Sequence, residues 1–319
     1  MPVRAWSQLH PKQFLNMRIL VTGHTGFVGR HLFAHVAGGA VGDVECIAPD
    51  AGFSLDSKEA VESSLSGLAF DGVIHLAAQS HVPTSFEDPM GTYDTNVMGT
   101  VRLLQVLHKR RFTGRLLFVS SGDVYGLVNP DSLPVNERLD PLPSNPYAAS
   151  KLAAESACLA WARFAGFSTI VARPFNHVGR DQRTSFAVAR FADAIARMAT
   201  GSEPLRLTSG RLDVTRDFLD VRDVIDAYFA LLRNGQPGEI YNVCSGVERR
   251  LDDILQSLIR SAGLSVDCHV DPLLIRPVEL LRMAGDASKL QAQTGWAPRI
   301  PFAETLNDLL NHELRKYTP

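Results

Sequence analysis

The stretch MRILVTGHTGFVG, residues 17–29, constrains the fold more than any other part of the chain. A short apolar run enters a glycine-rich turn, and residues 27–36 follow with helical periodicity. Glycine suits such a turn because the backbone adopts angles that other residues avoid, and because a side chain would keep a pyrophosphate from the helix N-terminus. The stretch therefore predicts the strand, turn and helix that open a dinucleotide-binding fold, with glycines at Gly23, Gly26 and Gly29.

Further β-like runs follow along the first half of the chain. They cover residues 44–50, 72–78, 115–121 and 167–174, and segments with helical periodicity, such as 97–110, separate them. Alternating strands and helices are typical of a parallel, doubly wound sheet. The expected fold class is therefore α/β, with a Rossmann-type sheet.

The regular alternation of strands and helices ends after about residue 174. Short helices and isolated strands, such as 239–245, are separated by loops rich in Arg, Gly and Pro. We predict a dinucleotide-binding domain at 17–174 and a smaller C-terminal α/β domain at 175–319. This second domain is expected mainly to bind substrate and to send some segments back to the Rossmann sheet. Residues 1–16 are predicted to be a disordered N-terminal extension.

The composition excludes several classes of function. The net charge is -2 and no run of five like charges occurs, so neither a nucleic acid nor a membrane is an expected partner. No segment approaches the roughly 18 apolar residues that a membrane span needs. The four cysteines are widely spaced and fit neither a zinc site nor a disulfide framework, which predicts reduced thiols in a cytoplasmic protein.

Two signals on the identity of the cofactor conflict. Asp50 is expected to end the second strand, near the position where an acidic residue binds the adenine ribose and disfavours a 2′-phosphate. Arg30 and His24, which lie in the turn, could instead meet that phosphate. NADPH and NADH therefore both stay open, dual use included, with NADPH favoured. A second acidic residue, Asp56, is a candidate partner for the adenine amino group.

The end of the third strand is also suited to a nucleotide. Ala77 and Ala78 are small and allow close approach of a ligand to the backbone. His75 and His81 flank them, but no carboxylate or third histidine completes a metal-binding set. We therefore expect no metal.

The stretch NPYAASK carries the candidate catalytic pair. Asn145 as cap and Pro146 at the first helical position predict a helix start, and Tyr147 and Lys151 then emerge on one helix face. A phenol has an ordinary pKa of about 10, and a nearby ammonium together with an oxidised nicotinamide would favour the phenolate. We predict that Tyr147 is the acid-base group and that Lys151 also holds the nicotinamide ribose. Ser121, at the end of the fourth strand, is predicted to hydrogen-bond the carbonyl oxygen being reduced.

From residue 17 onward the chain resembles the extended short-chain dehydrogenase/reductase family that acts on nucleotide sugars. The resemblance rests on GHTGFVG, HLAAQSHV, SSGDVYG, NPYAASK, RPFNHVG, RDFLDVRDV and YNVCSG. It implies a Rossmann-type domain that binds NAD or NADP and a C-terminal domain that grips a nucleoside-diphosphate sugar. The cofactor-binding residues that it implies are Gly23, Thr25, Gly26, Phe27, Val28, Gly29, Arg30, Asp50, Asp56, Leu76, Ala77, Ala78, Gln79, Asn96, Tyr147, Lys151, Pro174 and His177.

The same resemblance implies the contacts to substrate. Arginines are expected at the diphosphate because a planar guanidinium can clamp phosphate oxygens at two points. The residues implied are Ser80, Ser85, Ser121, Asp123, Tyr147, Asn176, Arg183, Arg216, Arg276 and Glu279. The later stretches FNHVGRDQ, VCSG, RPVE and TGWAPRIP are most similar to members that reduce GDP-4-keto-6-deoxy-D-mannose to GDP-D-rhamnose. Relatives pair through helices that flank the sheet, which implies a homodimer.

The stretch SSGDVYG bears on which reaction is catalysed. Dehydratases of the family use a carboxylate pair after the catalytic Ser or Thr to protonate the departing 6-hydroxyl and remove the 5-proton, but here these positions are Gly122 and Asp123. Glycine cannot donate a proton and aspartate is one methylene shorter than glutamate, so elimination is disfavoured. We expect NAD(P)H-dependent reduction of the 4-keto group of a nucleotide-diphosphate 6-deoxy-4-ketohexose. A nucleotide-sugar 4-epimerase, a 4,6-dehydratase and a non-catalytic cofactor-sensing scaffold remain as alternatives.

Overall fold

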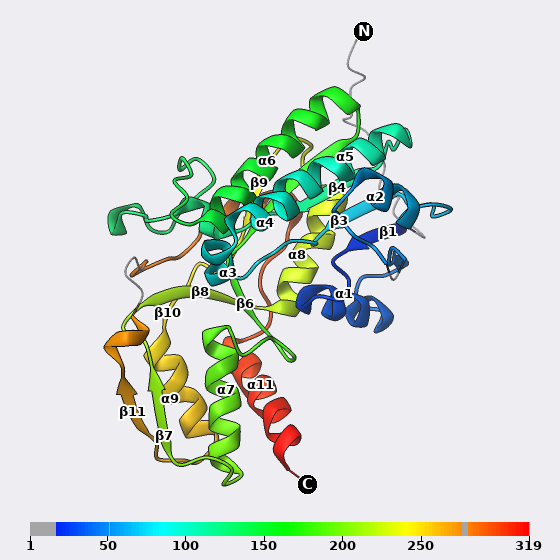
Figure 1. The fold of residues 1–319 in the computed structure, drawn as a ribbon. Coiled ribbons are helices and arrows are strands. Elements are labelled where there is room, and N and C mark those ends of the chain that lie inside the picture. Colours follow the sequence, from blue (N-terminus) through cyan, green and yellow to red (C-terminus); the bar gives the residue numbers. More distant parts are fainter. Residues whose placement is uncertain (1–16, 51, 276–279, 319) are drawn as a thin grey trace.

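A computed structural model describes residues 17–50, 52–275 and 280–318 of the chain. The predicted N-terminal extension at 1–16 and the predicted substrate residues Arg276 and Glu279 lie outside these described residues. Helices cover both faces of a central parallel sheet, and a smaller group of strands and helices lies beside it (Figure 1). Within the described residues, no helix has both the length and the apolar character needed to cross a bilayer.

The central sheet confirms the predicted α/β fold of Rossmann type. Its six strands are all parallel and lie in the order β2-β1-β3-β4-β5-β9. Because β1 has β2 on one side and β3 on the other, the order reverses at β1, which is where such sheets bind their ligands. The strands are β1 (Met17–Thr22), β2 (Val44–Ile47), β3 (Gly72–His75), β4 (Arg115–Val119), β5 (Ser168–Pro174) and β9 (Ile240–Val243).

Two apolar clusters hold the helices to the two faces of this sheet. One cluster packs α2, α5 and α6 against it, and the other packs α1, α8 and α10. Strand β4 contributes alternate residues to the two clusters, Phe118 to the first and Leu117 to the second, as expected for a strand buried on both faces. The helices are α1 (Phe27–Ala37), α2 (Lys58–Ser64), α3 (Val82–Glu87), α4 (Pro89–Tyr93), α5 (Gly99–Lys109), α6 (Pro146–Ala165), α8 (Val221–Asn234) and α10 (Ser288–Thr294).

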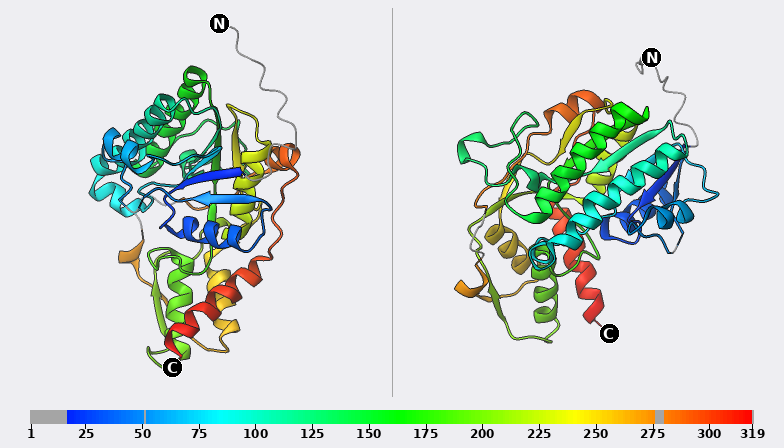
Figure 2. Two further views of the ribbon diagram at one scale, coloured as in Figure 1. Left: turned by 90° about the vertical axis from the view of Figure 1, so that its right-hand side faces the viewer. Right: turned by 45° about the horizontal axis from the view of Figure 1, so that its top comes forward.

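The C-terminal elements form a separate lobe with an apolar core of its own, visible beside the sheet in both views of Figure 2. Strands β10, β8 and β6 form a three-stranded sheet in that order, and β11 pairs with β7 in parallel. Strand β9 does not join them and instead completes the central sheet beside β5. The elements are β6 (Asn176–Val178), α7 (Ala187–Ala199), β7 (Arg206–Ser209), β8 (Thr215–Asp220), β10 (Glu248–Arg250), α9 (Leu251–Ser261), β11 (Asp267–Val270) and α11 (Phe302–Tyr317). The domain division at residue 174 stays a prediction.

Several predicted boundaries are wrong, and the strands predicted to end at residues 78, 121 and 245 end at His75, Val119 and Val243. The second strand ends at Ile47, so Asp50 does not end it and lies exposed three residues further on. The helix predicted at 97–110 begins at Gly99 and follows a π-helical turn at Asp94–Met98. By contrast, the predicted start of α6 is confirmed, because the side chain of Asn145 accepts a hydrogen bond from the backbone N–H of Ala148 at 2.8 Å.

Candidate active site

The glycine-rich turn after β1 is packed so closely that it admits no side chain at Gly23. This residue has a φ of +75°, and a Cβ there would lie 2.7 Å from the backbone nitrogen of Ala77 at the end of β3. Gly26, the N-cap of α1, makes no side-chain capping bond. The N-terminus of α1 therefore has no side-chain cap from Gly26, and it lies beside the carboxyl ends of β1 and β3. These residues fit the pyrophosphate of a dinucleotide, whose oxygens would accept hydrogen bonds from the backbone N–H groups of the first turn of α1.

Asn96 fixes the segment that follows β3. Its Oδ1 accepts from the backbone N–H of Gln79 at 2.8 Å, and its Nδ2 donates to the carbonyl of Gln79 and to the hydroxyl of Ser150, both at 2.9 Å. Asn96 is buried, whereas Leu76, Ala77 and Ala78 are half-buried beside it. The side chain of Asn96, which we predicted to bind cofactor, thus ties residues 76–79 to α6 through three protein hydrogen bonds.

The three predicted catalytic residues come together in the structure. Tyr147 lies in the first turn of α6 and Lys151 one turn later, with only 9% and 3% of their surfaces exposed. Ser121 follows β4 and caps a 3-10 turn at Gly122–Tyr125, where its Oγ accepts from the N–H of Asp123 at 3.1 Å. The hydroxyl of Ser121 also forms a hydrogen bond with the phenol of Tyr147. A phenol and a serine hydroxyl therefore meet at the carboxyl end of the central sheet, and the lysine lies one helical turn from the phenol.

The protein environment shifts the pKa values of Tyr147 and Lys151. Burial raises the pKa of Tyr147, the nearby carboxylate of Asp123 raises it further, and the hydrogen bond with Ser121 opposes them. Burial lowers the pKa of Lys151 to about 8, although Cys158 and Glu155 oppose this change. The protein groups that the structure describes thus raise the phenol pKa rather than lower it, and the predicted effect of an oxidised nicotinamide stays a prediction. The resting form of Tyr147 is the neutral phenol.

Several other predicted cofactor residues surround the start of α1. The ring of Phe27 stacks on that of His177 with the centroids 6.0 Å apart, and His177 is bonded through Nδ1 to the carbonyl of Phe175 at 3.0 Å. Burial lowers the pKa of His177, so its ring is neutral at physiological pH. Arg30 donates to the carbonyl of Thr25 at 2.8 Å, and its second contact, at 3.4 Å, is to the carbonyl of Asp181.

The remaining cofactor candidates are spread around the same edge. Val28 is half-buried in α1, and Pro174 is buried at the end of β5. Asp50 and Asp56 are both exposed on the segment between β2 and α2. Their carboxylates face solvent, where either could reach an adenosine, and their cofactor roles stay predictions.

Other predicted substrate residues lie on different elements of the C-terminal lobe. Arg216 on β8 lies directly opposite Arg249 on β10, and Asn176 on β6 lies beside Phe218 on β8. Arg183 is exposed in the loop that follows β6. Like charges opposite each other in a sheet repel, and the nearby carboxylate of Asp217 favours the charged form of Arg249. Our sequence reasoning missed Arg249, and only the register of β10 against β8 reveals it.

The two predicted serine contacts differ from each other. Ser80 is exposed at the end of the segment after β3, where a ligand can reach it. Ser85 is fully buried in α3, and its hydroxyl donates to the carbonyl of Val82 at 2.7 Å. The structure therefore does not bring Ser85 to the surface of the site.

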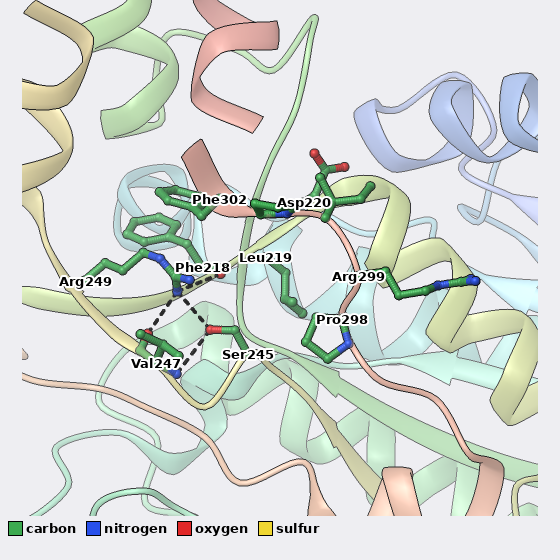
Figure 3. Close-up of a pocket in the computed structure, with 11 residues that line it drawn as sticks. Phe218, Leu219, Asp220, Ser245, Val247, Arg249, Pro298, Arg299 and Phe302 are labelled. Carbon is green, nitrogen blue, oxygen red and sulfur yellow. Dashed lines mark hydrogen bonds between the residues drawn. The ribbon is translucent and has the colours of Figure 1, made fainter. Parts of the chain in front are cut away.

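A pocket lies between β8, the loop after β9 and the segment that enters α11 (Figure 3). The Nη1 of Arg249 donates there to the hydroxyl of Ser245 at 3.0 Å and to the carbonyls of Phe218 and Val247 at 3.3 and 3.2 Å. Its guanidinium also lies 4.7 Å from the centroid of the Phe302 ring. None of the predicted catalytic residues lines this pocket, so it is a neighbour of the candidate active site rather than its centre.

Across the parts of the chain that the structure describes, no group of three or more His, Cys, Asp or Glu side chains could hold a metal ion. All four cysteines are free thiols, with Cys158 and Cys244 buried and Cys46 and Cys268 half-buried.

Comparison with known proteins identifies the family. The family model described as GDP-mannose 4,6 dehydratase matches residues 51–309. The chain belongs to this family. It is 43% identical over 297 residues to GDP-6-deoxy-D-mannose reductase of Pseudomonas aeruginosa, covering 93% of this chain and 97% of that protein. It is 31% identical to dTDP-glucose 4,6-dehydratase of Mycolicibacterium smegmatis, covering 92% of each.

Solved structures of family members agree with the fold. The structure of RMD from Pseudomonas aeruginosa complexed with NADPH has a TM-score of 0.90 and 42% identity, with 94% of this chain and 99% of that chain covered. UDP-glucose 4-epimerase of Thermotoga maritima with UDP-glucose has a TM-score of 0.85 and 26% identity, with 95% and 100% covered. The predicted family, fold and enzyme class, an NAD(P)-dependent oxidoreductase of nucleotide sugars, are confirmed.

Proposed function

We propose that this protein reduces the 4-keto group of GDP-4-keto-6-deoxy-D-mannose with NADPH or NADH and forms GDP-D-rhamnose. The observation that carries the proposal is the 43% identity to a GDP-6-deoxy-D-mannose reductase over nearly the whole of both chains. The meeting of Ser121, Tyr147 and Lys151 at the carboxyl end of the sheet supplies the groups that such a reduction needs. The comparisons support this reaction as the sequence predicted it.

The raised pKa of Tyr147 suits a reduction. A ketone gains a hydride at carbon and a proton at oxygen, and the bound reduced nicotinamide supplies the hydride. Tyr147 supplies the proton from its hydroxyl, which burial and Asp123 keep protonated until it is needed. Ser121, already bonded to that phenol, orients the ketone oxygen, and Lys151 binds the nicotinamide ribose. Solvent returns the proton to Tyr147 after the alcohol has formed.

The packing around Gly122 argues against the dehydratase alternative. A Cβ at this position would lie 3.1 to 3.2 Å from the ring of Phe175, which is buried. The ring thus leaves little room for the side chain that a dehydratase would need there as an acid. Asp123 remains beside Tyr147 and orients substrate, but it has no carboxylate partner at position 122 with which to carry out elimination.

The residues for the diphosphate are proposed from their placement. Arg216 and Arg249, opposite each other on two strands, would clamp phosphate oxygens, and Asn176 would contact the sugar or a phosphate. Arg183 is a weaker third arginine in an exposed loop. The GDP preference rests on the reductase relative alone.

The choice of cofactor rests on the turn of α1. A relative with 42% identity to this chain has been solved in complex with NADPH. Arg30 lies at the start of α1, where its guanidinium could bind a 2′-phosphate. The exposed Asp50 opposes such a phosphate, so NADH is expected to be used as well. Competition between the two reduced cofactors at equal concentration measures the preference.

The same enzyme is proposed to be a homodimer in the cytoplasm. Large apolar side chains are exposed on the helices of the sheet face that α5 and α6 cover, with Phe164 on α6 at 72% and Met90 on α4 at 78% exposed. Such surfaces mark association sites. Four free thiols suit a reducing compartment. Light scattering after gel filtration should give twice the chain mass, and a monomer would refute the dimer.

One incubation tests the proposed reaction against its rivals. Purified protein is supplied with GDP-4-keto-6-deoxy-D-mannose and either NADPH or NADH, and oxidation of the cofactor is followed while the sugar is identified. Stoichiometric oxidation with GDP-D-rhamnose as product supports the reductase. An epimerase would interconvert nucleotide sugars without consuming cofactor, and a cofactor-sensing scaffold would bind it without turnover.

A further inference from the structure

A charged pair lies buried directly behind the predicted catalytic residues. Arg173 donates from Nε to Oε1 of Glu155 at 3.0 Å and from Nη2 to Oε2 at 2.7 Å, and each residue is only 2% exposed. The hydroxyl of Ser120 also donates to Oε1 of Glu155. Withdrawing two charges from water costs several kcal/mol per ion before the pair recovers any of it. Stability alone is therefore a poor reason for such a pair.

The pair joins the three elements that carry the candidate site. Glu155 lies on α6, one helical turn after Lys151 and two turns after Tyr147. Ser120 directly precedes Ser121 after β4, and its N–H donates to the carbonyl of Ala172 on β5 at 2.8 Å. Arg173 sits on β5. Movement of α6 relative to β4 and β5 would therefore break these bonds and separate the phenol from the serine.

The far side of Arg173 is also fixed. Its guanidinium lies 4.9 Å from the centroid of the Tyr125 ring, and the hydroxyl of Tyr125 donates to Oδ1 of Asn242 on β9 at 2.7 Å. The side chain of Asn242 is itself held in place, because its Nδ2 donates to the carbonyl of Val135 at 3.0 Å. The guanidinium is held between a carboxylate and an aromatic face, so its geometry is rigid.

We propose that Glu155, held by Arg173 and Ser120, is a positioning residue. It fixes the position of α6 relative to β4 and β5 and keeps Lys151 charged for dinucleotide binding. The proposal deepens the proposed function, since it rests on the role of Lys151 at the nicotinamide ribose. Glu155 is the near carboxylate on the same helix face as Lys151. Its negative charge opposes the loss of the lysine proton that burial favours.

Cys158 and Glu155 both oppose the loss of the Lys151 proton, and of these two Glu155 is the carboxylate. His75 on β3 is neutral because burial lowers its pKa to about 3, and burial keeps Cys158 a neutral thiol by raising its pKa. Tyr147 is likewise a neutral phenol, and the carboxylate of Asp123 lies near it. On β4 the ammonium lies over the ring of Phe118, whose centroid is 4.5 Å from Nζ.

The test measures binding of NADPH, by quenching of protein fluorescence, as a function of pH in wild type and Glu155→Gln. Without the carboxylate the pKa of Lys151 falls further, so the lysine loses its proton at a lower pH. We expect NADPH affinity to fall at least about threefold at pH 7.5 but to change little at pH 6, where the lysine stays charged. An unchanged pH dependence would overturn the proposal. Because binding needs no sugar substrate, failure of the proposed reaction leaves this result readable.

Two further variants separate positioning from general stability. Glu155→Gln with Arg173→Met removes both charges and avoids an unpaired buried guanidinium, so it should unfold less readily than Glu155→Gln alone. We expect this double variant to keep the shifted pH dependence, and a return to wild-type behaviour would show that the pair is only structural. Glu313→Gln is the matched control, since Glu313 is also 2% exposed but lies on α11 with Lys316 at 2.7 Å. It should leave the pH dependence of NADPH binding unchanged, and a shift like that of Glu155→Gln would also refute the proposal.

Discussion

The glycine turn offers a prediction whose size follows from the structure. Gly23 combines a φ of +75° with a backbone contact, since an added Cβ would lie 2.7 Å from the nitrogen of Ala77 and 2.9 Å from the carbonyl carbon of Leu76. Both contacts are to backbone directly after β3, where the N–H of Leu76 donates to the carbonyl of Thr22 at 3.2 Å. Neither atom can rotate away as the end of a flexible side chain would.

The change Gly23→Ala therefore adds two costs that a second glycine separates. A left-handed conformation costs a residue with a Cβ about 1–2 kcal/mol. Overpacking against fixed neighbours adds about 1–3 kcal/mol, so the free energy of unfolding should fall by about 2–5 kcal/mol in total. Gly39 has the same φ of +75° but nothing within 4 Å of an added Cβ. Gly39→Ala should thus show only the first cost, about 1–2 kcal/mol.

Urea unfolding of both variants measures the two costs, and titration with NADPH measures their effect on binding. Gly23→Ala should weaken binding because any shift of the turn away from Ala77 also moves the N-terminus of α1. Gly39→Ala should bind NADPH like the wild type, since Gly39 lies beyond the other end of α1. Equal loss of stability in the two variants, with NADPH affinity unchanged in both, would refute the reasoning.

Three other predictions concern α6. Tyr147→Phe should lower kcat by about 10²–10⁴-fold, the usual contribution of a general acid, while NADPH titration gives an unchanged affinity; turnover at the wild-type rate would remove Tyr147 from the reaction. A profile of kcat/KM against pH should fall as the pH rises through about 8, because Lys151 with its lowered pKa then loses its charge. A profile that stays flat to about pH 9.5 would contradict this, since it would indicate a lysine with the ordinary pKa of about 10.4. Asn145→Ala should lower the free energy of unfolding by about 1 kcal/mol in urea, since the cap to Ala148 is lost, and no change would mean that the cap is not stabilising.

Sequence reasoning succeeded where the determinants are local. The strand, turn and helix at residues 17–37 are set by glycine spacing and helical periodicity, and the start of α6 by Asn145 and Pro146. These features depend on residues within a few positions of one another. The same holds for the meeting of Tyr147 with Lys151, which are one helical turn apart.

Sequence reasoning failed where distant contacts decide. The strand at Val44–Ile47 pairs with β1 only over four residues, so apolar character up to position 50 overstates its length. The direction of the Tyr147 pKa shift depends on burial and on Asp123, 24 positions earlier in the chain. The contact of Glu155 with Arg173 joins residues 18 positions apart on different elements, and no pattern around either residue indicates it.

The environment of Tyr147 and the packing at Gly122 both favour reduction over the related reactions of this fold. An epimerase or a dehydratase begins by taking a proton from a sugar hydroxyl, which needs a phenolate at the start of the cycle. A reductase begins with a neutral phenol, and the described groups around Tyr147 favour that form because its pKa is raised. A reduced nicotinamide ring carries no positive charge, so its binding would not draw the phenol toward the phenolate. A side chain at position 122 would require the ring of Phe175 to shift, and glycine itself supplies no proton donor for the elimination that distinguishes a dehydratase.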